Sequence, residues 1–104
     1  MSSESEAAPT IAGKLSYGMY NTVKKTRAEA ILGLKGTKYS LADIPNDAIK
    51  SMLTGILSGE MAWIEAWQGN NYDHGNVVLY KNGTIGVVED GNQKLSYAVQ
   101  WSDE

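Results

Sequence analysis

NVVLYKNGTIGVVEDGNQKLSYAVQW, residues 76–101, contains three runs rich in β-branched and aromatic residues, separated by two turn sequences. Asn82 and Gly83 lie between the first two runs, and both residue types tolerate the positive φ that a type I′ hairpin turn requires. The runs themselves have the composition of strands. The stretch therefore predicts an antiparallel meander in the C-terminal part of the chain.

The turn at residues 82–83 also predicts how the first two strands pair. A two-residue turn places Tyr80 opposite Ile85 and Val78 opposite Val87, so these four side chains share one face of the hairpin. Because side chains alternate along a strand, a slip of one residue would move all of them to the other face. The predicted face of each strand therefore depends on the length of this turn.

The third strand can extend the same apolar face in one register. Its apolar residues join that face when Val87 opposes Leu95, which leaves residues 90–92 as a three-residue loop. The other face of the hairpin is also apolar, through Val77, Leu79 and Val88. A sheet that is apolar on both faces is covered on both sides. We expect helices on one side, and the Trp-rich segment, the chain ends or a second subunit on the other.

Two helices are expected before the meander. Between about Met19 and Leu34, apolar residues recur at spacings of three and four, and Gly36 follows as a C-terminal glycine should. A second helix is indicated by a stripe with the spacing of a core-facing helix, formed by Ile49, Met52, Leu53, Ile56 and Leu57. Asp43 is its expected N-cap, and Gly59 is expected to end it.

The sequence MAWIEAWQ, residues 61–68, fits two structures. As a helix it would place Trp63, Ile64 and Trp67 on one face, and as a strand it would alternate the two tryptophans with small residues. The preceding Gly59 and the aromatic content favour the strand. The fold class predicted for the whole chain is α+β, with two N-terminal helices packed on a C-terminal antiparallel meander of three to four strands. Residues 13–104 are expected to form this single domain, after a disordered tail at 1–12.

Composition restricts the classes of function. The chain has 104 residues, no cysteine, 42% apolar and 20% charged residues, which is typical of one small globular domain without disulfides or thiolate sites. No apolar run approaches the ~20 residues that cross a bilayer, and the N-terminus has no signal-peptide pattern. We therefore expect a cytoplasmic protein that does not associate with membranes. Host cytoplasm is expected if the protein is viral, and a small phage or bacterial accessory protein would suit this size.

Catalytic signatures are weak. The lone histidine, His74, follows Asp73 in a polar loop, and such a pair could act as an acid and a base in a small hydrolase-like enzyme. Adjacent loop residues usually point apart, and one histidine without cysteine is a poor set of metal ligands. No glycine-rich phosphate motif is present. We expect no catalytic residue, no metal and no cofactor, and keep this pair as an alternative.

The charge is distributed unevenly along the chain. Residues 11–40 hold six cationic side chains and one acidic one, although the net charge of the chain is −3. This asymmetry can indicate an anionic partner. A binder of an anionic small molecule, nucleotide or nucleic acid is therefore one hypothesis, not the favoured one. Its candidate residues are Lys24, Lys25, Arg27, Lys35 and Lys38, which the sequence places on or beside the first helix.

The favoured hypothesis is a non-catalytic protein that acts through an apolar, aromatic surface of the sheet. The chain has three Trp, six Tyr and no Phe, and Trp and Tyr are enriched at interfaces. Its expected partner is a second copy of the chain, in a homo-oligomer, or another protein. The candidate interface residues are Trp63, Trp67, Tyr72, Val77, Leu79, Val88 and Trp101.

Overall fold

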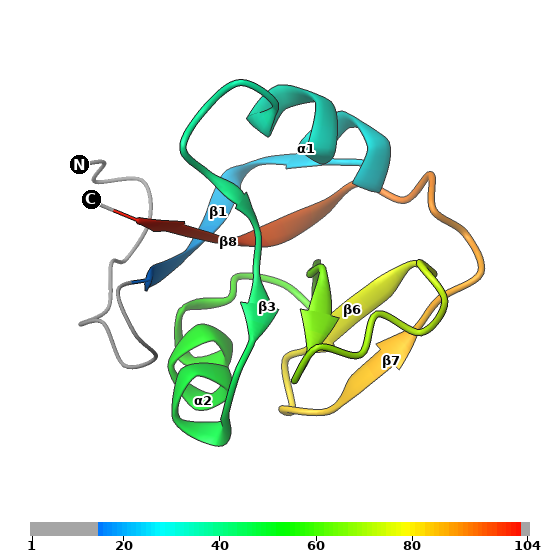
Figure 1. Ribbon diagram of the computed structural model, residues 1–104. Helices are drawn as coiled ribbons and strands as arrows, with labels where there is room; N and C mark the ends of the chain where they lie inside the picture. Colours follow the sequence, from blue (N-terminus) through cyan, green and yellow to red (C-terminus); the bar gives the residue numbers. More distant parts are fainter. Residues whose placement is uncertain (1–14, 103–104) are drawn as a thin grey trace.

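The computed structural model describes residues 15–102, so the predicted tail at residues 1–12 lies outside the described part (Figure 1). Within it, eight strands and two helices follow one another in a fixed order. The elements are β1 (Leu15–Lys25), α1 (Arg27–Leu34), β2 (Ser40–Leu41), β3 (Asp43–Ile44), α2 (Asp47–Ile56), β4 (Met61–Trp63), β5 (Ala66–Trp67), β6 (Val77–Tyr80), β7 (Ile85–Val87) and β8 (Leu95–Ser102). Neither helix is long and apolar enough to span a membrane.

β8 pairs with three other strands of the main sheet. Strand β1 pairs with it in the antiparallel direction along one edge, beginning at Leu15 opposite Ser102. The other edge is shared, because β4 pairs with its first half in parallel and β2 pairs with its second half in the antiparallel direction. The sheet order is β1-β8-β4-β6-β7, and β3 and β5 form a separate short parallel pair. In Figure 1, β8 lies beside β1 along its length.

The predicted α+β fold with an antiparallel meander is therefore wrong. Strands account for 41% of the described residues and helices for 20%, and the sheet contains parallel as well as antiparallel pairs. β7 pairs with β6, not with β8, so Val87 does not oppose Leu95. The physical reason is that β8 is buried on both faces, and the connection at 88–94 carries it away from the hairpin to a position between β1 and β4.

The N-terminal half of the first predicted helix is a strand. Residues 15–25 form β1, and the helix begins only at Arg27. Tyr17 and Met19 alternate with Gly18 along β1 and are buried, so the period of two in this segment outweighs the three-and-four spacing that predicted a helix. Thr26 then caps α1, because its side chain accepts a hydrogen bond from the Glu29 backbone N–H and the Glu29 carboxylate accepts one from the Thr26 N–H.

The hairpin turn is one residue longer than predicted. The Tyr80 N–H donates to the Thr84 carbonyl, and Leu79 opposes Ile85, so Lys81, Asn82 and Gly83 form a three-residue loop. Gly83 has a φ of 93°, which is the left-handed conformation that this loop type requires at its last position. The predicted register is therefore wrong by one residue, and Val87 lies opposite Val77 instead of Val78.

Two other predictions are confirmed. The stripe of the second helix forms α2, with Ile49 and Leu53 fully buried, although its N-cap is Asn46 instead of Asp43. Residues 61–68 contain the strands β4 and β5, so the strand interpretation of this segment is correct. The segment is not one continuous strand, because it bends at Glu65, and Trp63 and Trp67 pack in two different hydrophobic cores. The predicted alternation, which puts both tryptophans on one face, is therefore wrong.

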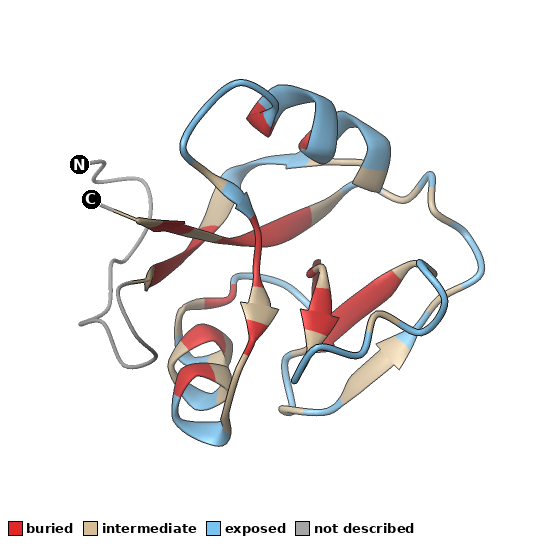
Figure 2. Ribbon diagram, in the orientation of Figure 1, coloured by how far each residue is buried: buried red, intermediate tan, exposed pale blue. Residues whose placement is uncertain are grey.

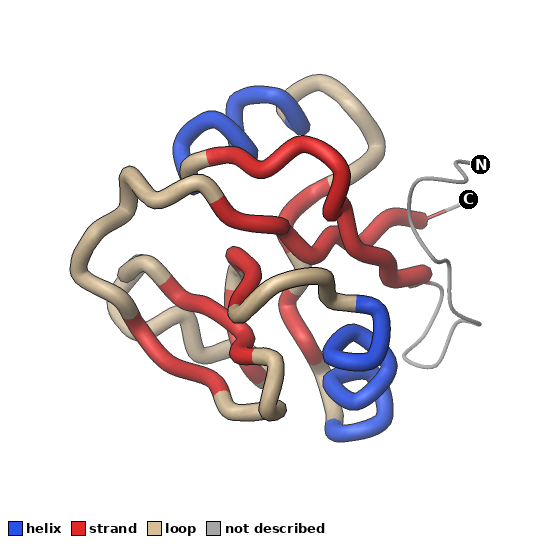
Figure 3. The backbone as a smooth tube through the Cα atoms, turned by 180° about the vertical axis from the view of Figure 1, so that it is seen from behind, coloured by secondary structure: helices blue, strands red, loops and turns tan. Residues whose placement is uncertain are grey.

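The sheet separates two hydrophobic cores, which contain most of the buried residues in Figure 2. Alternate residues of the strands enter alternate cores: along β6, Val77 and Leu79 enter the first core, and Val78 enters the second. Helix α2 closes the first core, and α1 contributes Ala30 and Leu34 to the second. The two helices thus lie on opposite faces, not on one face as predicted, and the view from behind shows them at opposite ends of the molecule (Figure 3).

The C-terminal end of α2 is held by distant side chains. Its last turn contains no basic residue, yet a helix end has carbonyl groups without partners inside the helix. Lys81, from the hairpin loop, donates to the Thr54 carbonyl at 2.8 Å and to the Leu57 carbonyl at 2.6 Å. The Asn21 amide donates to the Ile56 carbonyl at 2.8 Å. These bonds attach α2 to both the hairpin and β1.

Replacing Lys81 tests this attachment. We expect Lys81→Met to lower the free energy of unfolding by about 1 kcal/mol, because it removes a charged donor from two carbonyls at a largely exposed site. Urea unfolding would measure the change, with Lys35→Met as the control, since Lys35 is also exposed. Equal stability of the two variants would contradict the proposed role of Lys81.

Candidate functional site

Helix α1 exposes its larger apolar side chains. It buries Ala30 and Leu34, whereas Ile31 is 40% exposed and Leu32 is 71% exposed. Val23, at the end of β1, is 62% exposed and lines the same shallow depression as Leu32. We call Val23, Ile31 and Leu32 the α1 surface. Contiguous exposed apolar residues of this kind, surrounded by polar groups, are typical of an interaction site.

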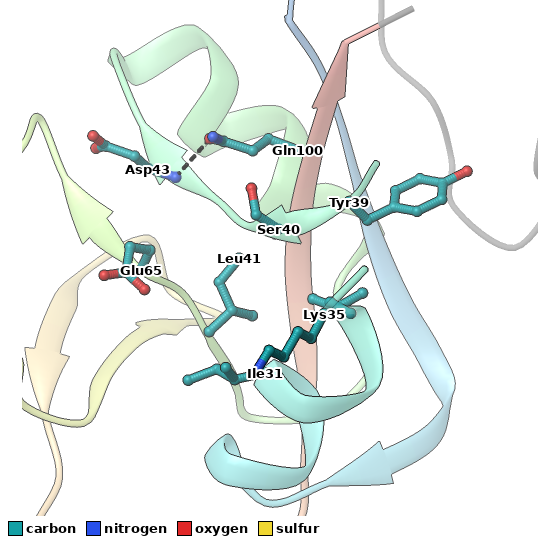
Figure 4. Close-up of a pocket in the computed structure, with 9 residues that line it drawn as sticks. Ile31, Lys35, Tyr39, Ser40, Leu41, Asp43, Glu65 and Gln100 are labelled. Atoms are coloured by element: carbon teal, nitrogen blue, oxygen red, sulfur yellow. Dashed lines mark hydrogen bonds between the residues drawn. The ribbon is translucent and has the colours of Figure 1, made fainter. Parts of the chain in front are cut away.

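Two hollows adjoin this surface and share Ile31 and Lys35. The first has a volume of about 520 Å³ and is shown in Figure 4. Ile31 and Leu41 provide apolar walls, and Asp43, Glu65 and Gln100 lie at its polar border. The Asp43 backbone N–H donates to Gln100 Oε1 at 2.9 Å, which ties β3 to β8 beside the hollow.

The second hollow is cationic. It has a volume of about 650 Å³ and contains, besides Ile31 and Leu32, the side chains of Arg27, Lys35 and Asn92. Among the residues 15–102 that line it, none is acidic. The hollow thus combines two cations with an apolar wall, which is a suitable environment for an anionic group attached to an apolar one.

Arg27 separates the two hollows. Its Nη2 lies 3.8 Å from Glu65 Oε1, and its side chain is 19% exposed. The Arg27 Nε is buried and has no hydrogen-bond partner within the described chain. Buried donors are almost always paired in folded proteins, so this Nε is an exception. The exposed 19% of the side chain, with Nη2 at 3.8 Å from Glu65, is the part that a carboxylate or a similar anion can reach.

The surroundings of α1 carry more positive than negative charge. The residues lining the second hollow and the depression at Leu32 include one acidic side chain, Glu29. The cationic side chains in the same set are Lys24, Lys25, Arg27, Lys35 and Lys94. Glu29 is already engaged, because Lys94 Nζ lies 3.0 Å from its Oε1. With Asp43 and Glu65 of the first hollow, the count at α1 is five cations to three acids, and this excess of positive charge favours an anionic ligand or an acidic partner.

The predicted interface residues lie mostly inside the molecule. Trp63, Val77 and Leu79 have no exposed surface, and Trp101 is 2% exposed. Trp67 and Val88 are partly buried, and Tyr72 is 38% exposed. Trp63 also donates its indole N–H to the Lys25 carbonyl at 2.9 Å. The chain itself thus covers both faces of β6, whereas Val87 of β7 is 49% exposed.

The predicted anion-binding residues do not share one helix. Lys24 and Lys25 belong to β1, where Lys24 Nζ donates to the Ser58 carbonyl and to Ser96 Oγ. Lys25 lies over the Tyr97 ring, 5.9 Å from its centroid. Lys38 follows α1 and lies 5.6 Å from the Tyr39 ring centroid. Only Arg27 and Lys35 of this set meet at the second hollow.

Asp73 and His74 lie in an exposed turn. Both have a φ of 61°, and the Asn71 amide lies 3.1 Å from His74 Nδ1. Among residues 15–102, no three His, Cys, Asp or Glu residues are arranged to hold a metal ion. The enzyme hypothesis built on this pair stays an untested prediction.

Sequence reasoning missed the apolar part of the site. The helix predicted between about Met19 and Leu34 contains Val23, Ile31 and Leu32, and its apolar stripe is expected to face the core. The capping box of Thr26 and Glu29 was the available signal, since it sets the start of the helix at Arg27. Ala30 and Leu34 lie on the buried side of this eight-residue helix, and Leu32, two residues from each of them, lies on the opposite side. A comparison with protein-family models finds no match, and a comparison with curated proteins finds none either.

Glu29 provides a test of the electrostatics at α1. Hydrogen bonds from the Thr26 backbone and from Lys94 lower the pKa of Glu29 below its ordinary value of 4.5. The folded chain therefore holds this proton less tightly than the unfolded chain. The interaction contributes stability above about pH 4.5, and this contribution is lost as the pH falls through the lower folded pKa.

We expect Lys94→Met to raise the pKa of Glu29 part of the way back toward 4.5, because the Thr26 backbone bond remains. A carbon-detected NMR titration of the side-chain carboxyl groups would measure it. Lys50→Met is the control, because Lys50 pairs with Asp47 on α2. An identical Glu29 pKa in both variants would show that Lys94 does not act on Glu29 in solution.

Proposed function

We propose that the protein is a non-catalytic interaction protein that binds an acidic, apolar segment of another protein through the α1 surface. The observation that carries the proposal is the exposure of Leu32, 71% of which faces solvent on a helix with five cationic side chains around it. Single exposed leucines are common, but here Leu32 lines the second hollow together with Ile31 and the shallow depression together with Val23.

The apolar part supplies affinity. Burial of a Leu, Ile or Val side chain contributes about 1.5–3 kcal/mol when it is complete. The α1 surface holds three such side chains that are only partly buried in the free protein. Apolar centres with polar borders are the usual arrangement at protein interfaces, and the hollows on either side of Ile31 would receive side chains of the partner.

The charges select the partner. Five cations and three acids line the two hollows and the depression at this surface, and Glu29, one of the acids, is paired with Lys94. The excess charge is positive, so an acidic segment is favoured over a basic one.

A protein segment fits better than a nucleic acid, because the exposed centre of the site, Val23, Ile31 and Leu32, is aliphatic. Tyr39 lines the first hollow, but its ring packs against those of Tyr20 and Trp101 and is less available for base stacking. The proposal keeps the interaction function predicted from the sequence and moves it from the sheet to α1.

The test is a selection of ligands from a phage-displayed library of random dodecapeptides. We expect the selected peptides to be enriched in Asp or Glu together with Leu, Ile or Phe. Leu32→Ser should weaken their binding at least about tenfold, which corresponds to about 1.4 kcal/mol. The control is Val87→Thr, because Val87 is 49% exposed on β7, on the face of the sheet opposite α1. This variant should bind the selected peptides with the same affinity as the wild type.

Exposed positions tolerate substitution, so both variants should unfold at the same urea concentration as the wild type. Peptides without acidic enrichment, or peptides that bind Leu32→Ser as well as the wild type, would overturn the proposal. Light scattering tests the remaining possibility, which is that a second copy of the chain occupies the surface. A dimer that dissociates on Leu32→Ser would show that a second copy occupies the surface, and would also overturn it.

A further inference from the structure

We propose that the second hollow is a carboxylate-binding site, in which Arg27 and Lys35 hold an acidic side chain that lies next to an apolar one. The proposal rests on the function proposed above and assigns the residue that anchors the docked segment. Three features support it: the guanidinium of Arg27 has no close partner, hydrogen bonds hold one wall of the hollow in place, and the Glu65 carboxylate lies near the same guanidinium.

Arg27 is poorly satisfied in the free protein. A guanidinium offers five N–H donors in a planar fork, yet among the described residues the carboxylate near Arg27 is that of Glu65, at 3.8 Å, which is too long for a hydrogen bond. The Arg27 Nε has less than 1 Å² of exposed surface and no partner among the described residues, so a ligand in the hollow cannot reach this atom. The side chain as a whole is 19% exposed and lines the hollow, and a carboxylate there would accept hydrogen bonds from its two Nη groups.

The wall opposite Arg27 is held in place. The Asn76 amide donates to the Val88 carbonyl at 3.1 Å and to the Glu89 carbonyl at 3.4 Å. Gly91 lies so close to this amide that a Cβ would meet Asn76 Oδ1 at 2.9 Å. The loop that carries Gly91 and Asn92 is therefore fixed against Asn76, and the hollow exists before a ligand arrives. A preformed site loses less entropy when it binds.

Glu65 acts as an internal competitor. It is 40% exposed and approaches the same guanidinium from the first hollow. Exposed ion pairs of this length contribute little to stability, so a ligand carboxylate with shorter contacts can replace it. Ile31 and Leu32 line the hollow beside Lys35, and they would contact the apolar neighbour of the acidic side chain. The site thus favours an acidic residue flanked by apolar residues.

The test uses two blocked tripeptides, Ac-Leu-Glu-Leu-NH2 and Ac-Leu-Gln-Leu-NH2, titrated into the protein. The Nε–Hε NMR signal of Arg27 reports binding. We expect the Glu peptide to shift this signal at a concentration about tenfold lower than the Gln peptide, because only the former offers a carboxylate to the guanidinium. Arg27→Gln should abolish the preference when backbone signals of Leu32 are followed. The control Lys38→Gln should retain it, because Lys38 lines neither hollow.

Glu65→Gln is a second test variant. It should strengthen binding of the Glu peptide several-fold, and a misfolded protein would not bind the peptide more tightly. Equal binding of the two tripeptides, or a preference that survives Arg27→Gln, would overturn the carboxylate site. An unchanged affinity in Glu65→Gln would overturn the role of Glu65 as competitor. If the library peptides still depend on Leu32 while the tripeptide preference is absent, the proposed function stands and only this assignment fails.

Discussion

The pairing of β8 on both edges is the constraint on which the rest of the structure depends. One edge is filled by β1, and the other is divided between β4 and β2, because each position along an edge can pair with only one neighbouring strand. The division puts Trp63 of β4 and Leu41 of β2 into the core that α1 closes. It also places Gln100 beside Asp43, at the border of the first hollow. The site at α1 is therefore a consequence of the sheet order.

The fold could be predicted only where local pattern and tertiary burial agree. The stripe of α2 has the period of a helix, and its members at Ile49 and Leu53 are fully buried, so the prediction is confirmed. For β1 the two disagree. Its side chains fit helical spacing, but pairing with β8 buries Tyr17 and Met19 in the alternation of a strand. Strand order depends on contacts between residues far apart in the chain, and no turn sequence indicated that β8 would leave β7.

The candidate site holds two departures from the usual rules of folding, and a third is the buried Trp101 Nε1, which also has no partner among the described residues. Leu32 faces solvent, and the buried Arg27 Nε has no partner. Elsewhere the chain satisfies even the distant carbonyls of α2, through Lys81 and Asn21. Deviations of this kind concentrate at functional sites, because a binding surface must remain incomplete until its ligand arrives. The charges of Arg27 and Lys35 could be found from the sequence, but their meeting at one hollow could not, since the fold brings the loop of Asn92 to them.

The position of β8 is the claim that a solution measurement can test most directly. In an NMR spectrum of the whole chain, backbone NOEs should connect Trp63 with Tyr97 and Leu41 with Val99, since these residues are paired in the structure. The two contacts would establish that β4 and β2 share one edge of β8, and the position of the site at α1 depends on this arrangement. Backbone NOEs between Val87 and Leu95 would instead show the simple meander, and would contradict the fold and the site that depends on it.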